Sequence, residues 1–488
     1  MSPLPLYLGG SWRQGRGVPI STYNPHDNSV LAEVSTADAA DVDDAVQAAE
    51  RAMAEPGWRN MPAHQRAQIL HRIAALIDRD AERLAQLQRQ DNGKPIHETR
   101  ALVMSAAGTF RYFAAACETL GGEATPPRGD YLSLSLYEPL GPVAAITPWN
   151  SPIASEAQKV APALAAGNAA IVKPSELTPL LALELAKLAD EAGLPKGLLS
   201  VLPGTGAITG AALVAHRGIR KVTFTGGTVT GRNIGRVAAD KLMPVSLELG
   251  GKSPNIVFED ADMAQAINGV LFGIFSSQGQ SCIAGSRIFV ARSIYDRFTA
   301  ELTRRAAALR IGNPLEPSTQ IGPLISPEHR AKVESYVKLA GEEGGRLLCG
   351  GARPADAALQ AGNYFQPALI DGLTNACRTA QEEIFGPVGV LLPFDTEDDL
   401  IAQANDSIYG LACGIWTADY RRAWRVARAV DAGNIWINTY KLFSIATPFG
   451  GNKDSGTGRE KGLDGLRAYM RQKSLYWDLS GRPLPWAD

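Results

Sequence analysis

The alternation of short apolar runs with helical segments between residues 142 and 240 restricts the fold more than any other feature of the sequence. The apolar runs 142–147 and 168–172 each precede a segment with helical periodicity, and a similar run, 221–225, leads into glycines and a further helix. Strands that alternate with helices in this way are parallel, because each helix returns the chain to the same edge of the sheet. We therefore predict an α/β fold with a doubly wound parallel sheet whose carboxyl-end loops carry a ligand.

A second α/β unit is expected to begin near Gly251, because 488 residues are too many for one hydrophobic core. Its pattern indicates a strand over 286–291 and a buried strand over 433–439. It also indicates three helices, over 294–309, 327–341 and 396–405.

The N-terminal part of the chain has the pattern of a scaffold, and we assign it no chemistry. Residues 1–35 carry turn residues between short apolar runs, which predicts an edge ribbon of small strands. A helix is expected from Ala37, a longer one from Ala63 to the Asn92-Gly93 stop, and a third over 98–120.

Residues 131–137 alternate strictly between leucine and polar or aromatic side chains, as a strand with two different faces does. The C-terminal segment 473–479 is of similar type. Two interpretations stay open from these residues: the strands pair between subunits, or they belong to an internal hairpin.

Charge and cysteine content exclude several classes of function. Lys and Arg number 48 against 50 Asp and Glu, so the net charge of -2 offers no electrostatic basis for binding nucleic acid or an anionic membrane. We find no secretory leader pattern and no run of about 18 apolar residues, so we expect a cytoplasmic protein with no membrane partner. The five cysteines are widely spaced without a C-x-x-C pair, which predicts free thiols and no metal site.

Cys282 lies in S-S-Q-G-Q-S-C-I-A-G-S-R, residues 276–287, among small and polar neighbours. Free cysteines are usually buried among large apolar residues, so this thiol is a candidate nucleophile. The alternative is a core cysteine beside a glycine turn.

Two further residues at predicted strand ends could assist such a nucleophile. Glu248 follows an apolar strand, and burial there would raise its pKa toward the range useful to a general base. Asn150 follows Pro148-Trp149 and offers an amide donor for an oxyanion. Alternatively, Glu248 is a buried acid with a structural partner, and Asn150 is an ordinary turn residue.

A phosphate site is indicated where the run F-T-G-G-T-V-T-G, residues 224–231, connects a strand to a helix. The spacing of its glycines is not G-x-G-x-x-G, so the usual dinucleotide fingerprint is absent. Lys173 and Glu176 follow another strand, and a carboxylate there can accept the ribose hydroxyls of NAD and repel a 2'-phosphate. Either residue alone could be a solvated turn residue.

Seven ordered motifs make the chain resemble the NAD(P)-dependent aldehyde dehydrogenase superfamily over nearly its whole length. They are P-W-N (148–150), K-P-S-E (173–176), F-T-G-G-T-V-T-G (224–231), L-E-L-G-G-K-S-P (247–254), G-Q-S-C-I-A-G-S-R (279–287), E-E-I-F-G-P-V (382–388) and P-F-G-G-N-K-D-S-G-T-G-R-E (448–460).

The resemblance implies a hydrolytic enzyme that oxidises an aldehyde to an acid through a cysteine thiohemiacetal and thioester. Cys282 would be the nucleophile, Glu248 the general base, and Asn150 with the Cys282 backbone N–H the oxyanion hole. The resemblance also implies a homodimer or homotetramer of three-domain subunits. The domains are an NAD-binding domain (1–119 and 141–250), a catalytic domain (251–450) and a domain of oligomerisation strands (120–140 and 465–488).

The resemblance also implies NAD as cofactor, with NADP as the alternative, since some relatives with the Glu176 carboxylate accept both. The cofactor contacts it implies are Thr147, Trp149, Lys173, Ser175, Glu176, Gly206, Gly226, Gly227, Thr228, Leu249, Glu383 and Phe385. Gly227 and Val229 stand where the family usually has serine and glutamate, which predicts looser phosphate contact.

The substrate pocket follows from the same alignment of motifs. Its expected residues are Ser151, Ser155, Gln158, Ser276, Ser281, Ile283 and the loop 441–443, with Phe443 and Phe449 as apolar walls. This polar character predicts a hydroxylated or otherwise polar aldehyde, a lactol or a semialdehyde; the alternative is a broad-range scavenger. A cysteine esterase, a CoA-acylating dehydrogenase and a non-catalytic relative are the competing classes.

Overall fold

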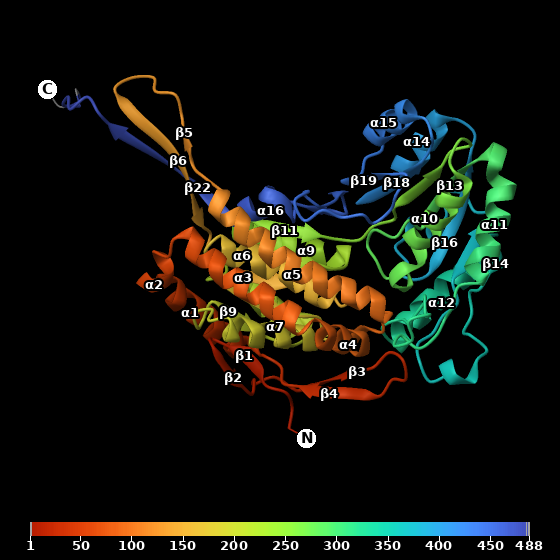
Figure 1. Ribbon diagram of the computed structural model, residues 1–488, viewed down its shortest axis with the longest axis horizontal. Coiled ribbons are helices and arrows are strands. Elements are labelled where there is room, and N and C mark those ends of the chain that lie inside the picture. Colours follow the sequence, from red (N-terminus) through yellow and green to blue (C-terminus); the bar gives the residue numbers. More distant parts are fainter. Residues whose placement is uncertain (1, 485, 487–488) are drawn as a thin grey trace.

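The computed structural model describes residues 2–484 and 486, and its strands form two large sheets and a smaller sheet that projects from the body (Figure 1). The predicted α/β class is confirmed. Residue 1 of the predicted NAD-binding domain and residues 485, 487 and 488 of the predicted oligomerisation segment lie outside the described residues.

The first large sheet has the order β2-β1-β9-β8-β7-β10-β11-β21. Its five central strands are parallel, and β7 has β8 on one side and β10 on the other, so the chain reverses its direction of travel across the sheet between them. In such sheets, ligands bind outside the carboxyl ends of the strands at this reversal. The strands are β1 (Leu6–Leu8), β2 (Ser11–Arg13), β7 (Val143–Ile146), β8 (Ala170–Lys173), β9 (Leu199–Val201), β10 (Lys221–Thr225), β11 (Val245–Glu248) and β21 (Gly456–Thr457).

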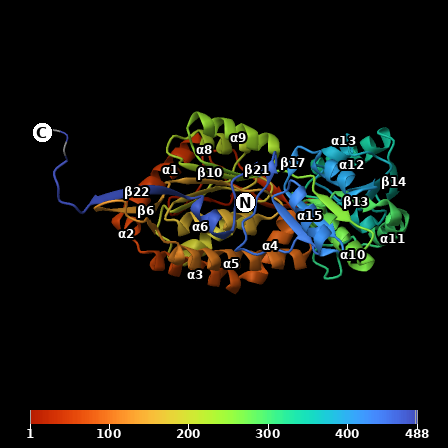
Figure 2. The same cartoon turned by 90° about the horizontal axis from the view of Figure 1, so that it is seen from above.

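Helices cover both faces of this sheet, with α8 and α9 on one side and α3 and α5 on the other (Figure 2). The helices of this unit are α1 (Ala39–Ala54), α2 (Pro56–Arg59), α3 (Ala63–Arg79), α4 (Ala81–Asn92), α5 (Ile96–Thr119), α6 (Pro152–Ala165), α7 (Leu180–Glu191), α8 (Ala211–Ala215), α9 (Thr228–Asp240) and α16 (Gly462–Arg467).

The single long helix predicted from Ala63 to Asn92 is wrong, because the chain leaves the helical conformation at Asp80. The Asp80 carboxylate accepts hydrogen bonds from Arg79 (2.8 Å) and Arg83 (2.7 Å), and these bonds lower its pKa to about 2. Apolar periodicity continues through the break, so the sequence pattern does not reveal it. The predicted stop is confirmed: Gly93 ends α4 with a left-handed φ of 73°.

The second large sheet has the order β14-β15-β16-β13-β12-β18-β19. The strand predicted over 433–439 is confirmed as β19, but its predicted burial is wrong: β19 lies at the edge of the sheet, and Ile437 on it is 42% exposed. The strands are β12 (Pro254–Val257), β13 (Arg287–Ala291), β14 (Arg346–Cys349), β15 (Ala368–Asp371), β16 (Val388–Phe394), β18 (Ala412–Trp416) and β19 (Asn434–Ile437). The helices are α10 (Met263–Phe275), α11 (Tyr295–Ala307), α12 (Pro327–Glu342), α13 (Arg378–Gln381), α14 (Glu397–Asn405) and α15 (Tyr420–Ala429).

The projecting sheet consists of β5 (Glu123–Ala124), β6 (Tyr131–Pro139) and β22 (Met470–Asp478) (Figure 1). The two strands singled out from the sequence pair antiparallel with each other, from Tyr131 opposite Asp478 to Pro139 opposite Met470. The observed pairing is therefore within one chain. β22 has a neighbour on one side only in the described structure, and Tyr476 and Trp477 on it are exposed.

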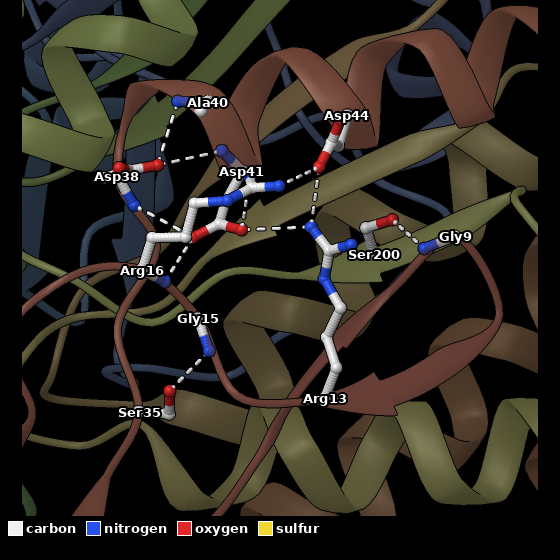
Figure 3. A network of polar contacts seen from close by, with 10 residues as sticks. All are labelled: Gly9, Arg13, Gly15, Arg16, Ser35, Asp38, Ala40, Asp41, Asp44 and Ser200. Carbon is white, nitrogen blue, oxygen red and sulfur yellow. Dashed lines mark hydrogen bonds and ion pairs between the residues drawn. The ribbon is translucent and has the colours of Figure 1, made fainter.

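The N-terminal ribbon is held to helix α1 by an ionic network (Figure 3). Arg13 and Arg16 both bond to the buried Asp41 carboxylate (2.9 and 3.0 Å) and to the more exposed Asp44 (2.8 and 3.0 Å). Asp41 also accepts the backbone N–H of Arg16 (2.7 Å), and it forms a capping box with Asp38 at the start of α1. This network fixes the ribbon that contains β1 and β2.

Two further pairs of strands lie outside the three larger sheets. One pair is β3 (Ile20–Tyr23) with β4 (Val30–Val34), and the other is β17 (Tyr409–Gly410) with β20 (Asn452–Lys453).

We expect Asp41→Ala to lower the free energy of unfolding by about 2 kcal/mol, because it removes the shared acceptor of two arginines and of the Arg16 and Asp38 backbone N–H groups, and with it the capping box. Asp44→Ala is the matched control: it has the same arginine partners, but its side chain is 38% exposed. Thermal unfolding should show a clearly larger decrease in Tm for Asp41→Ala. Equal decreases would contradict this assignment of the network.

Candidate active site

A cavity of about 1030 Å³ lies at the carboxyl ends of β7, β8, β10 and β11, where the first sheet faces residues of the second unit. Cys282, Glu248 and Asn150 all line it, although they are far apart in the sequence. The cavity occupies the position predicted from the reversal of strand order.

Cys282 lies in the loop between α10 and β13, which begins with a tight turn over Ser276–Gly279. Gly279 has a φ of 69°, and a Cβ there would lie 2.2 Å from the carbonyl oxygen of Gly386, so a larger residue would displace the loop. Gln280 anchors the loop on both sides: its side chain accepts the Ile325 N–H (2.9 Å), and its carbonyl accepts the Asn150 amide (3.0 Å).

The Cys282 thiol is protonated in the free protein. Burial raises its pKa to about 12, the nearby Glu383 and Glu248 add to this rise, and Lys441 opposes it. A thiol in this state is a poor nucleophile until it loses its proton. The site must therefore supply an acceptor for that proton.

Glu248, the last residue of β11, is 3% exposed, and neither of its carboxylate oxygens has a hydrogen-bond partner among the described residues. Burial raises its pKa well above the usual range, and the charge of Glu460 raises it further. Buried carboxylates are normally hydrogen-bonded, so an unpartnered one in a cavity marks a functional group.

Asn150 follows β7, and its side-chain amide is directed at the nucleophile loop, where it donates to the Gln280 carbonyl (3.0 Å). A primary amide carries two N–H groups, so a second donor remains for an oxygen atom in the cavity.

The other end of the cavity has the features of a dinucleotide site. The buried Lys173 bonds to Glu176 (3.1 Å), whose side chain is 44% exposed. Burial favours a higher pKa for Glu176, but the charge of Lys173 and hydrogen bonds from Lys173 and from the backbone together lower the pKa, which favours the ionised carboxylate.

Glycines leave room along the same wall. A Cβ at Gly206 or Gly227 would meet no atom within 4 Å, and both residues line the cavity. Gly227 is the N-cap of α9, which has no side-chain cap, so the amides of its first turn are available to an anion. These residues fit a diphosphate.

Nearly all the residues expected at the site line this one cavity. They are Thr147, Trp149, Asn150, Ser151, Ser155, Gln158, Lys173, Ser175, Glu176, Gly206, Gly226, Gly227, Glu248, Leu249, Ser281, Cys282, Ile283, Glu383, Phe385, Phe443 and Phe449. Thr228 and Ser276 do not. The Thr228 hydroxyl accepts the Gly250 N–H (3.3 Å), and the Ser276 hydroxyl donates to the Phe272 carbonyl (2.6 Å), so both brace loops instead.

The sequence interpretation missed Glu460 and Lys461, which also line the cavity. Glu460 forms an ion pair with the buried Lys159 and accepts from Thr223 (3.2 Å). Lys461 has φ 58° and ψ 175°, a backbone region that is essentially restricted to glycine and costs about 1–3 kcal/mol. The only signal was position, since Glu460 ends the last recognised motif and Lys461 follows it.

Comparison with known proteins accounts for this arrangement. The model of the aldehyde dehydrogenase family matches residues 12–475. The chain belongs to the aldehyde dehydrogenase family. The family assignment made from the sequence motifs is confirmed, and the protein is an oxidoreductase.

Named relatives of this aldehyde dehydrogenase are similar over almost its whole length. Betaine aldehyde dehydrogenase of Bacillus subtilis is 41% identical over 99% of both chains, and 5-carboxymethyl-2-hydroxymuconate semialdehyde dehydrogenase of Escherichia coli is 44% identical over 92% of this chain and 97% of its own. The structure of betaine aldehyde dehydrogenase from Staphylococcus aureus in complex with NAD+ is 38% identical, with a TM-score of 0.97 over 99% of this chain and 97% of that one.

The raised pKa of Cys282 predicts slow alkylation of the free enzyme. Below a pKa of about 12, the thiolate fraction rises tenfold with each pH unit, so labelling by iodoacetamide should keep accelerating from pH 7 to 9.5. Quantifying the modified Cys282 peptide by mass spectrometry measures this rate. A short synthetic peptide is the control, because its thiol should approach a plateau above its pKa of about 8.5; a plateau below pH 9 in the enzyme would contradict the prediction.

Proposed function

We propose that this aldehyde dehydrogenase oxidises an aldehyde to the carboxylic acid through a covalent intermediate on Cys282, with NAD as the cofactor. The observation that carries the proposal is the cavity shared by a thiol and an unpartnered carboxylate, Cys282 and Glu248. NAD is supported by the diphosphate-sized opening at Gly206 and Gly227 and by its presence in the structure of the relative from Staphylococcus aureus.

In the first half of the reaction, Cys282 gives its proton to water in the cavity, which passes it to solvent, and the sulfur attacks the aldehyde carbon. The resulting thiohemiacetal oxygen carries negative charge, which the Asn150 amide and the Cys282 backbone N–H stabilise. Bound NAD supplies the hydride acceptor for this carbon. A thioester then remains on Cys282.

In the second half, water hydrolyses the thioester. Glu248 removes the proton from this water, since both of its oxygens are free of other partners and its raised pKa makes it a stronger base than an exposed carboxylate. The acid product leaves, and the thiol takes back a proton.

The wider organisation of the enzyme is part of the same proposal. We assign NAD binding to 1–119 and 141–250, catalysis to 251–450 and subunit contacts to 120–140 and 465–488. The open edge of β22 and the exposed aromatic side chains on it support a homodimer or homotetramer. None of the helices in the described part of the chain has the length and apolarity that a membrane crossing requires; a cytoplasmic location remains our proposal.

For the substrate, we propose a polar aldehyde, a class that includes hydroxylated aldehydes, lactols and semialdehydes. Ser151, Ser155 and Gln158 support this assignment because they line the same cavity as Cys282. A broad-range scavenger is the alternative, in which these side chains contact water only.

Cys282→Ala should lower kcat/KM for aldehyde oxidation by at least a thousandfold, because no other cysteine lines the cavity in the described structure. Glu248→Gln should release about one NADH per site in a rapid burst and then turn over slowly, since it blocks only hydrolysis. Stopped-flow measurement of NADH absorbance distinguishes the two variants. Cys377→Ala, outside the cavity, is the control; normal turnover by Cys282→Ala would exclude the mechanism.

Glu176→Gln should lower the ratio of kcat/KM with NAD to kcat/KM with NADP at least tenfold, because the Glu176 carboxylate repels the 2'-phosphate of NADP. The measurement is the ratio of kcat/KM for the two cofactors at saturating aldehyde. Glu259→Gln removes a carboxylate that is paired with Arg422 outside the cavity, and it should leave the ratio unchanged. The same ratio in both variants would count against a role for Glu176 in cofactor choice.

A further inference from the structure

Lys441 and Lys461 line the cavity, and neither forms an ion pair with a carboxylate of the described residues. The Lys461 ammonium lies 4.1 Å from the centre of the Phe443 ring and 5.4 Å from that of Phe449. Among the described residues, this ammonium contacts these two rings and forms no hydrogen bond or ion pair. Lys441 donates only to the Ser276 hydroxyl (2.7 Å) and lies 5.7 Å from the centre of the Phe272 ring.

Two of the three carboxylates nearby, Glu460 and Glu98, already have other partners. Glu460 is paired with Lys159 and accepts from Thr223. Glu98 accepts the backbone N–H and the hydroxyl of Ser277 (2.8 and 2.9 Å) and lies 3.7 Å from Lys94. Burial raises the pKa of Glu248, and the charge of Glu460 raises it further, so its charged form is disfavoured. This end of the cavity is therefore electropositive.

The surroundings of Lys461 act on its charge in both directions. Burial lowers its pKa, but the charge of Glu460 acts in the opposite direction, and two aromatic faces attract the ammonium. Burial lowers the pKa of Lys441 to about 8, so this side chain is mostly protonated at pH 7. Both side chains are half-buried, and an anion that the chain does not provide would stabilise their charged forms.

The strained backbone of Lys461 points to the same conclusion. Its φ of 58° and ψ of 175° belong to a region that favours glycine, yet the position carries a long cationic side chain. Strain of this kind persists where the surrounding structure enforces it, and it concentrates at ligand-binding sites.

We propose that the substrate is an aldehyde that carries a carboxylate, which pairs with Lys461 and is assisted by Lys441. This inference rests on the proposed oxidation at Cys282 and narrows its substrate class to semialdehydes. A charged hydrogen bond from ammonium to carboxylate is about twice as strong as one between neutral groups, so a carboxylate is favoured over a hydroxyl.

The same geometry disfavours an aldehyde with a quaternary ammonium group. Such groups are bound by open aromatic faces. Here the Lys461 ammonium already occupies the faces of Phe443 and Phe449, and its charge repels a second cation. Lys461 therefore favours a negatively charged substrate and also disfavours a positively charged one.

The first test uses the unmodified enzyme with NAD and aldehydes that differ in charge. Initial rates of NADH formation give kcat/KM for 5-oxopentanoate, for neutral pentanal and 5-hydroxypentanal, and for trimethylammonioacetaldehyde. We expect 5-oxopentanoate to exceed both neutral aldehydes at least tenfold and the cationic aldehyde to be the poorest substrate. Equal values for the anionic and neutral aldehydes would overturn the inference and leave the proposed function intact. Oxidation of none of them would overturn the proposed function, and the inference with it.

The second test removes the cation. Lys461→Met keeps the length of the side chain, and it should lower the ratio of kcat/KM for 5-oxopentanoate to that for pentanal at least tenfold, mainly through a higher KM. Lys338→Met is the control, because Lys338 is 81% exposed on α12 and lies outside the cavity. An unchanged ratio in an active Lys461→Met enzyme would show that Lys461 does not bind the carboxylate.

Discussion

The short link between the two large sheets is the constraint on which the site depends. The chain passes from the end of β11 at Glu248 to the start of β12 at Pro254 through residues 249–253 alone. Close packing at this crossing requires glycine: a Cβ on Gly250 would lie 2.5 Å from the Glu383 carboxylate, and one on Gly251 would lie 2.3 Å from the Cys282 carbonyl oxygen. The link therefore brings a base, a nucleophile and a carboxylate from three distant segments into one cavity.

The second property of the site is that it keeps ionisable groups in an environment that disfavours their charged forms. Burial raises the pKa of Cys282 and of Glu248 and lowers that of Lys441. Asp41, a buried carboxylate outside the cavity, has close partners in Arg13 and Arg16 instead. The contrast separates charges that stabilise the fold from charges that are held ready for chemistry and binding.

Backbone strain is distributed in the same way. Among the described residues, nine that are not glycine have a positive φ, and four of these line the cavity: Ser277, Phe385, Lys441 and Lys461. Local conformational preference is thus overridden at the site, where precise placement of side chains matters more than stability. Each of these four side chains is supplied by a turn or loop that a regular helix or strand could not replace.

The sequence by itself determined the fold class, the parallel arrangement of the strands that end at the cavity, and the identity of Cys282, Glu248 and Asn150 as candidates. Strand and helix periods are local properties, and the family motifs carry the catalytic residue types with them. Only the tertiary structure decided that a helix breaks at Asp80, that β19 is an exposed edge, and that Lys461 faces two aromatic rings without a partner. Those outcomes depend on which distant segments become neighbours, and neither periodicity nor motif spacing contains that information.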